Sequence, residues 1–207
     1  MASRDSPRKV SRLAIAGWAL FAWATQPYFT LIMTFVYAPY FASAVVGDAT
    51  RGQSIWGFAT ATAGILIALT SPVLGAVADA TGRRKPWIAV FGAFLVAGAA
   101  ALWVAKPGDA ATIMPALIAF VIASIGAEFA HIFCNTMMPT LVPRNKVGSL
   151  SGLGWAVGYI GGMVSLISRR VFAERTDELE ALLPDLVEFV LTPYLGSAKA
   201  AKVARQS

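Results

Sequence analysis

Cysteine, histidine and charged side chains are all scarce in this sequence of 207 residues. The single cysteine, Cys134, excludes a disulfide within the chain, and the single histidine, His131, leaves no cluster of metal ligands. No glycine-rich motif for binding phosphates is present, so the sequence offers no support for nucleotide-driven chemistry and predicts no cofactor. Because no nucleophile, base and orienting group can be picked out as a set, we do not expect an enzyme.

Charged residues make up only 14% of the chain, whereas 57% of the residues are hydrophobic. This balance lies outside the range of ordinary soluble domains and indicates a membrane protein whose main partner is the lipid bilayer. The net charge of +6 could suggest nucleic acid as a partner. The cations, however, stand in short segments between apolar runs rather than on one basic face, which argues against nucleic-acid binding.

Five apolar runs are long enough to cross a hydrocarbon core of about 30 Å. They cover approximately residues 13–38, 55–78, 87–105, 110–134 and 150–167. The basic leader, residues 1–12, resembles the start of a signal peptide, but the apolar character that follows extends too far for a signal. Within the first run, Pro27 predicts a kink with a freed carbonyl, and Pro39 is the expected end.

The distribution of Lys and Arg predicts the orientation in the membrane. The leader holds four of these residues, the 79–86 loop three and the 135–149 loop two, whereas the alternate loops hold only Arg51 and Lys106. Positive charges concentrate on the cytoplasmic side of membrane proteins. We therefore expect a cytoplasmic amino terminus, in what is most simply a bacterial inner membrane.

Residues 169–207 differ abruptly from the rest, with six cations and six acids. Acids are costly at the centre of a membrane helix, so this segment does not read as a sixth span. An amphipathic or disordered tail is the expectation.

One polar loop, residues 75–87, carries a recognisable pattern. It contains Gly75, Asp79, Gly82, Arg83 and Arg84 in the order G-x-x-x-D-x-x-G-R-R. Glycine permits a close backbone approach or a sharp turn at such positions. The loop resembles the one between helices 2 and 3 of the major facilitator superfamily. The resemblance implies that the five residues form a conformational switch.

Three further stretches, residues 17–41, 128–143 and 150–162, are similar to the vacuole-effluxer-like branch of that superfamily. The resemblance implies an all-α membrane protein with twelve helices in two halves, of which this chain supplies the first five. It also implies a secondary transporter that exports small solutes, possibly amino acids, by alternating access. The alternatives are a truncated or frameshifted remnant, in which case DNA downstream of this sequence should encode the missing helices, and a subunit that pairs with another half or with a second copy.

Polar residues inside the apolar runs are the candidates for a transport pathway. Glu128, His131 and Asn135 are spaced three and four residues apart, which places them on one helix face. An acid within a membrane span is a functional candidate, and Glu128 could carry a proton or attract a cationic group of the solute. A structural pair of Glu128 with His131 is the alternative. Gln26 occupies the equivalent position in the first run, where it could instead satisfy the backbone freed by Pro27.

The last apolar run contains glycines every four residues, at Gly154, Gly158 and Gly162. This spacing places a groove on one helix face and allows a second helix to approach closely. We expect these glycines to serve helix packing rather than direct contact with a solute.

Overall fold

The computed structural model describes residues 11–172 and residue 202, and within them it is entirely helical. Five segments are long and apolar enough to cross a membrane: Arg12–Val45, Ala49–Thr81, Arg84–Val104, Ala110–Leu141 and Arg144–Arg169. The predicted all-α class with five membrane-length helices is therefore confirmed. The proposed tail, 169–207, lies outside the described residues except for 169–172 and 202, as does most of the basic leader.

The first segment is longer than the sequence suggested, because it continues past both prolines. It consists of α1 (Arg12–Pro27), η1 (Tyr28–Phe35), α2 (Tyr37–Tyr40) and η2 (Phe41–Val45). After Pro27 the hydrogen bonding widens to i→i−5, as in the 2.9 Å bond from the Val36 N–H to the Leu31 carbonyl. Such wide turns absorb the hydrogen bonds that proline cannot make. The helix thus changes geometry where a kink was expected, and Pro39 does not end it.

The second and third segments form a hairpin. Helix α3 (Ala49–Thr81) starts at Asp48, whose carboxylate accepts a hydrogen bond from the Arg51 N–H. It ends at Gly82, which adopts a left-handed conformation with φ of 63°. Helix α4 (Arg84–Ala101) follows directly and passes into one tight turn, η3 (Leu102–Val104).

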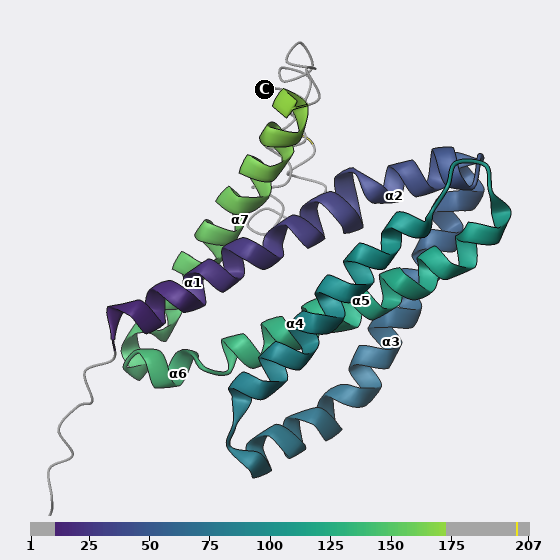
Figure 1. The fold of residues 1–207 in the computed structure, drawn as a ribbon. Coiled ribbons are helices and arrows are strands. Elements are labelled where there is room, and N and C mark those ends of the chain that lie inside the picture. The colour runs from purple at the N-terminus through teal and green to yellow at the C-terminus, as the bar shows by residue number, and fades with distance from the viewer. Residues whose placement is uncertain (1–10, 173–201, 203–207) are drawn as a thin grey trace, which may run out of the picture.

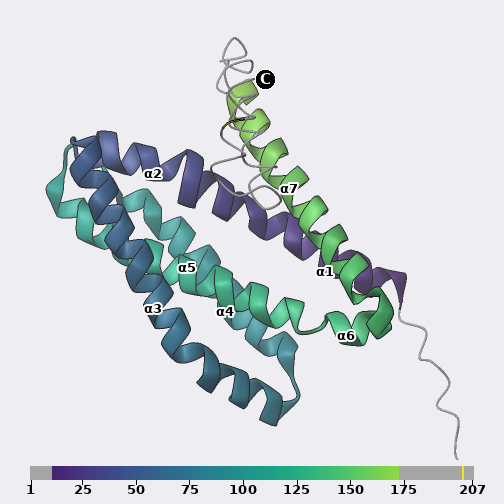
Figure 2. The same ribbon diagram turned by 180° about the vertical axis from the view of Figure 1, so that it is seen from behind.

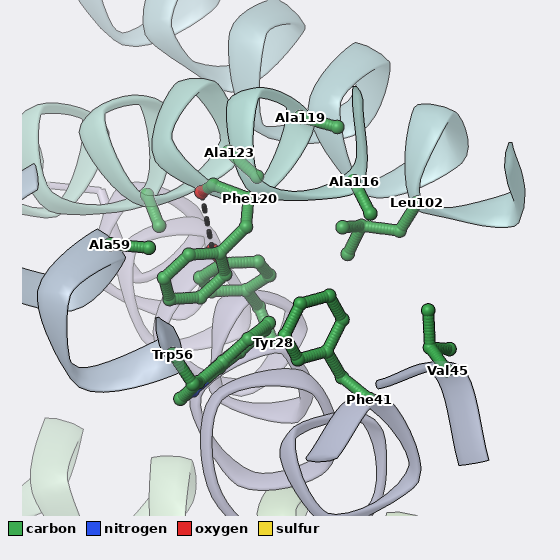
Figure 3. Close-up of a cluster of buried hydrophobic side chains, with 11 residues drawn as sticks. Tyr28, Phe41, Val45, Trp56, Ala59, Leu102, Ala116, Ala119, Phe120 and Ala123 are labelled. Carbon is green, nitrogen blue, oxygen red and sulfur yellow. Dashed lines mark hydrogen bonds between the residues drawn. The ribbon is translucent and has the colours of Figure 1, made fainter. Parts of the chain in front are cut away.

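Helix α5 (Ile113–Asn135), preceded by η4 (Ala110–Thr112), is the most buried of the five spans. It packs most closely against α4, where a Cβ at Gly98 would lie only 2.6 Å from the Ala123 nitrogen. At the same level of the helix, α5 also meets α3 and the distal part of the first segment in an aromatic core (Figure 3), in which the rings of Trp56 and Phe120 lie 4.0 Å apart, centroid to centroid. Helix α5 therefore contacts α1, α3 and α4 and lies at the centre of the bundle.

Helix α7 (Val147–Phe172) follows the short elements α6 (Met138–Leu141) and η5 (Arg144–Lys146) and takes a different course. It crosses α1 and then diverges from the other long helices (Figure 1). In the reverse view α3, α4 and α5 lie together below α1, whereas α7 rises above it (Figure 2). Its main contact is with α1. Helix α1 consequently joins α7 to the rest of the bundle.

Candidate functional site: a polar pocket between α1, α5 and α7

The polar residues of α5 lie along the side of that helix that meets the first segment. Ser124 is buried and shares a 2.8 Å hydrogen bond with the Tyr28 hydroxyl, in which either oxygen can donate. Glu128 follows one turn later, half-buried, and its carboxyl group is near enough to Tyr28 for an electrostatic interaction. The His131 ring lies 6.3 Å from the Phe29 ring, centroid to centroid. A continuous polar strip thus runs from Ser124 towards the end of α5.

Helices α1, α5 and α7 enclose a small pocket where this strip reaches α7. The eight lining residues are Trp18, Ala22, Gln26, His131, Asn135, Ser151, Gly154 and Trp155. The accessible volume is about 30 Å³. A space of that size holds one water-sized group.

The pocket brings together three of the four predicted pathway residues, namely Gln26, His131 and Asn135. Glu128 does not line the pocket and lies about one turn away, near Tyr28. Within the described residues no hydrogen bond or ion pair joins Glu128 to His131, so the structural pair considered as an alternative is not formed.

Gln26 is only 8% exposed, and its side chain makes no hydrogen bond to any other described residue. The side chains of Asn135 and Ser151 are likewise without a hydrogen-bond partner in the described part of the chain. Among the described residues only Thr30 Oγ1 is a fully enclosed side-chain polar atom without a partner, so the polar atoms of Gln26, Asn135 and Ser151 remain open to the pocket. The pocket therefore offers unused polar atoms from three different helices.

Trp18 closes the pocket at the end of α5. Its buried indole N–H donates a 3.2 Å hydrogen bond to the Cys134 carbonyl. Its ring occupies the space beside Gly154, where an added Cβ would lie 2.7 Å from a ring carbon. Trp18 thus packs in the interior and connects α1 to both α5 and α7.

The remaining glycines of α7 follow the same contact line. A Cβ at Gly158 would lie 3.4 Å from the Gln26 Oε1, which is an ordinary contact, and one at Gly161 would lie 3.0 Å from the Trp23 carbonyl oxygen. Gly162, the third glycine of the predicted stripe, is also buried. Gly161, which the predicted stripe did not include, thus also makes a close approach to α1.

Residues 75–87, predicted as a polar loop, form the end of α3, a turn at residues 82–83 and the start of α4, because both helices continue further than expected. This turn lies at the same end of the bundle as α6 (Figure 1). Asp79 is 75% exposed and forms an ion pair of 3.5 Å with Arg84. The Arg84 guanidinium also donates a 2.9 Å hydrogen bond to the Thr136 carbonyl, at the carboxyl end of α5. Arg83 is exposed, and the space around Gly75 is open among the described residues, so the expected close backbone approach there is not seen.

Sequence reasoning missed several members of this site, above all Trp18, Ser151, Trp155, Tyr28 and Ser124. Ser151 could have been found, because it lies three residues before Gly154 on the helix face that packs. The aromatic residues carry no such signal, since tryptophan and tyrosine are also common membrane-interface anchors. Among the described residues no three His, Cys, Asp or Glu side chains gather to hold a metal ion.

Comparison with known proteins gives two matches. The family model described as Major Facilitator Superfamily matches residues 2–166. An uncharacterized MFS-type transporter, YxiO of Bacillus subtilis (strain 168), is 26% identical over 155 residues, which are 72% of this chain and 35% of the relative. The chain thus spans about a third of the length of the curated relative it matches. No solved structure gives a significant match.

Proposed function

The chain belongs to the Major Facilitator Superfamily, and from that membership we propose that it forms the amino-terminal part of a carrier that moves a small solute by alternating access. The pocket between α1, α5 and α7 carries this proposal. In a membrane, polar side chains without partners are expensive unless they face water or a solute. Gln26, His131 and Asn135 are such side chains, and they converge from two helices on one space.

Efflux of a small solute such as an amino acid is the direction and class that we propose, in line with the resemblance to the vacuole-effluxer-like branch. Glu128 is the proposed coupling group, which would carry a proton or attract a cationic group of the solute. It lies beside the pocket rather than in it, so ion and solute would occupy neighbouring positions. The proposed orientation places the amino terminus and the 79–86 loop in the cytoplasm, as the Lys and Arg distribution predicts.

The loop with Asp79 and Arg84 is the proposed switch. Because Arg84 bridges Asp79 and the end of α5, a change at the loop is transmitted to the helix that carries the pathway residues. In the complete carrier, the exposed Asp79 would meet the amino-terminal end of a helix from the other half, where a carboxylate is favoured by the helix dipole. That contact would form in one state of the transport cycle and break in the other.

An alternative proposal is a membrane subunit or remnant that does not transport alone and requires another half or a second copy. The two proposals differ in one observable, which is solute flux through proteoliposomes that contain only these 207 residues. Saturable flux driven by an imposed proton gradient would contradict the alternative.

The experiment for the coupling role replaces Glu128 in the complete carrier that contains this sequence. Glu128→Gln should abolish flux without lowering the amount of protein in the membrane, because the amide keeps the size but cannot change charge. Asp109→Asn is the matched control, since Asp109 lies in a loop between the spans. If membrane abundance falls together with flux, Glu128 has a structural role instead.

A further inference from the structure

The innermost space of the pocket between α1, α5 and α7 is small, which limits the part of a solute that it can receive. We propose that it is a subsite for the primary ammonium group of the solute, with the remainder of the solute outside it. This inference deepens the proposed function and rests on it, since it names the solute class of the same site. It is drawn from the size of the pocket, its unused acceptors and its surrounding charge.

The size of the pocket favours a small head group. With about 30 Å³ accessible, the pocket admits one group of the size of a water molecule. A primary ammonium head meets this limit. A phosphate or a trimethylammonium head is too bulky on every side, whereas a carboxylate could insert one oxygen, so the charge around the pocket decides between an ammonium group and a carboxylate.

The lining supplies hydrogen-bond acceptors in the number that an ammonium group requires. Gln26 on α1, Asn135 on α5 and Ser151 on α7 each present an oxygen that has no hydrogen-bond partner in the described chain. An ammonium group has three donors and no acceptor. With both amides turned to present their oxygens, three acceptors on three helices would match the three donors of one ammonium group.

The surrounding charge favours a cation over a neutral group. The lining contains no Lys or Arg, and the carboxylate of Glu128 lies about one helical turn from His131 on the same helix. Two indole rings, Trp18 and Trp155, also border the space. Indole faces attract cations, and the effect grows where water is excluded.

Trp155 indicates where the rest of the solute would lie. Its side chain is 55% exposed, and its ring is stacked on Tyr159 at a centroid distance of 5.8 Å. A solute held by its ammonium head in the pocket would extend along the exposed side chain of Trp155. The subsite thus fixes one end of the solute and leaves the other end less restricted.

The test measures binding by saturation-transfer NMR to the 207-residue chain in lipid nanodiscs. The probes are n-butylammonium, tetramethylammonium and butyrate. We expect binding of n-butylammonium only. Ser151→Ala should weaken that binding about tenfold, because the lost hydrogen bond is made to a charged group. Ser149→Ala is the matched control, since Ser149 is exposed on the same helix and does not line the pocket.

Several results would overturn the subsite. They are binding of tetramethylammonium or butyrate as strongly as n-butylammonium, equal binding by the Ser151→Ala and Ser149→Ala variants, or no binding of any probe, which would leave a water molecule as the occupant. Size-exclusion profiles confirm that each variant is folded. Flux in the complete carrier separates the two proposals: transport of an anion or a neutral solute would disprove the subsite and leave the transporter function standing.

Discussion

Arg83 and Arg84 are adjacent cations at the turn between α3 and α4, and their surroundings differ. Arg83 is exposed, whereas Arg84 is 33% exposed and contacts both Asp79 and the Thr136 carbonyl. The sequence predicted the loop and its five residues but could not tell which arginine reaches α5. That distinction depends on the start of α4 at Arg84, which turns this side chain towards the end of α5.

Replacing Arg84 should loosen the end of α5. Arg84→Gln removes the bond to Thr136 and should cost about 1 kcal/mol of local stability, a charged hydrogen bond reduced by solvent screening. Cys134, the sole and buried cysteine, then reports the opening, and its alkylation by N-ethylmaleimide should be about fivefold faster. Arg83→Gln should leave the rate unchanged. Equally faster alkylation of Cys134 in both variants would show that the positive charge of the turn, and not the hydrogen bond to Thr136, stabilises the carboxyl end of α5.

The individual lining residues explain why the pocket was predicted only in part. Gln26, His131 and Asn135 stood out because polar residues are rare in apolar runs, and all three line the pocket. Trp18 and Trp155 line it too, but a tryptophan in a membrane span is compatible with packing, anchoring or binding. Only the crossing of α7 over α1 assigns these two rings to the site.

At the scale of elements, the contact between α1 and α7 depends on glycine. The sequence predicted the glycine face of α7 from its spacing, but not the partner, because helical periodicity identifies a face and not what covers it. The structure supplies α1 as the partner, with Trp18 beside Gly154 and Trp23 beside Gly161. The length of the first span was also underestimated, since wide turns carry the helix beyond Pro39 to Val45.

A methyl group at Gly154 should therefore separate the two helices. Gly154→Ala forces the Trp18 ring to move and should cost about 1–3 kcal/mol, as overpacking of a filled interior does. A lower midpoint of thermal aggregation in nanodiscs is the expected observation. Gly152→Ala is the control, because nothing lies within 4 Å of a Cβ there. Trp18→Leu should restore tolerance to Gly154→Ala, and a double variant no better than Gly154→Ala alone would refute this contact.

At the scale of the whole molecule, composition and loop pattern predicted the all-α class, the five spans and the superfamily. The arrangement in space was not predictable from them. Helix α7 leaves the other spans after crossing α1 (Figure 1), and no feature of its sequence specifies that divergence. Crossing angles follow from how side chains of two helices interlock, and a single sequence does not display both partners together.

Orientation is tested at the two ends of α3. In a Cys134→Ser background, Ala80→Cys should react with a membrane-impermeant maleimide only from the cytoplasmic side, and Ala49→Cys only from the opposite side. Both alanines are exposed, so their intrinsic reactivity is comparable. The excess of Lys and Arg beside residue 80 predicts that this end of α3 faces the cytoplasm. Reversed labelling would overturn the proposed topology.

The central claim is that water and solute reach the polar pocket inside the membrane, and cysteine accessibility at Gln26 tests it most directly. Gln26 lies deep in the first span and lines the pocket, whereas Val96 on α4 is 68% exposed on the outside of the bundle. In the Cys134→Ser background, Gln26→Cys should react with a small water-soluble thiosulfonate much faster than Val96→Cys, since thiolates form only where water reaches. Added n-butylammonium should slow that reaction. A rate at residue 26 no faster than at residue 96 would contradict the pathway.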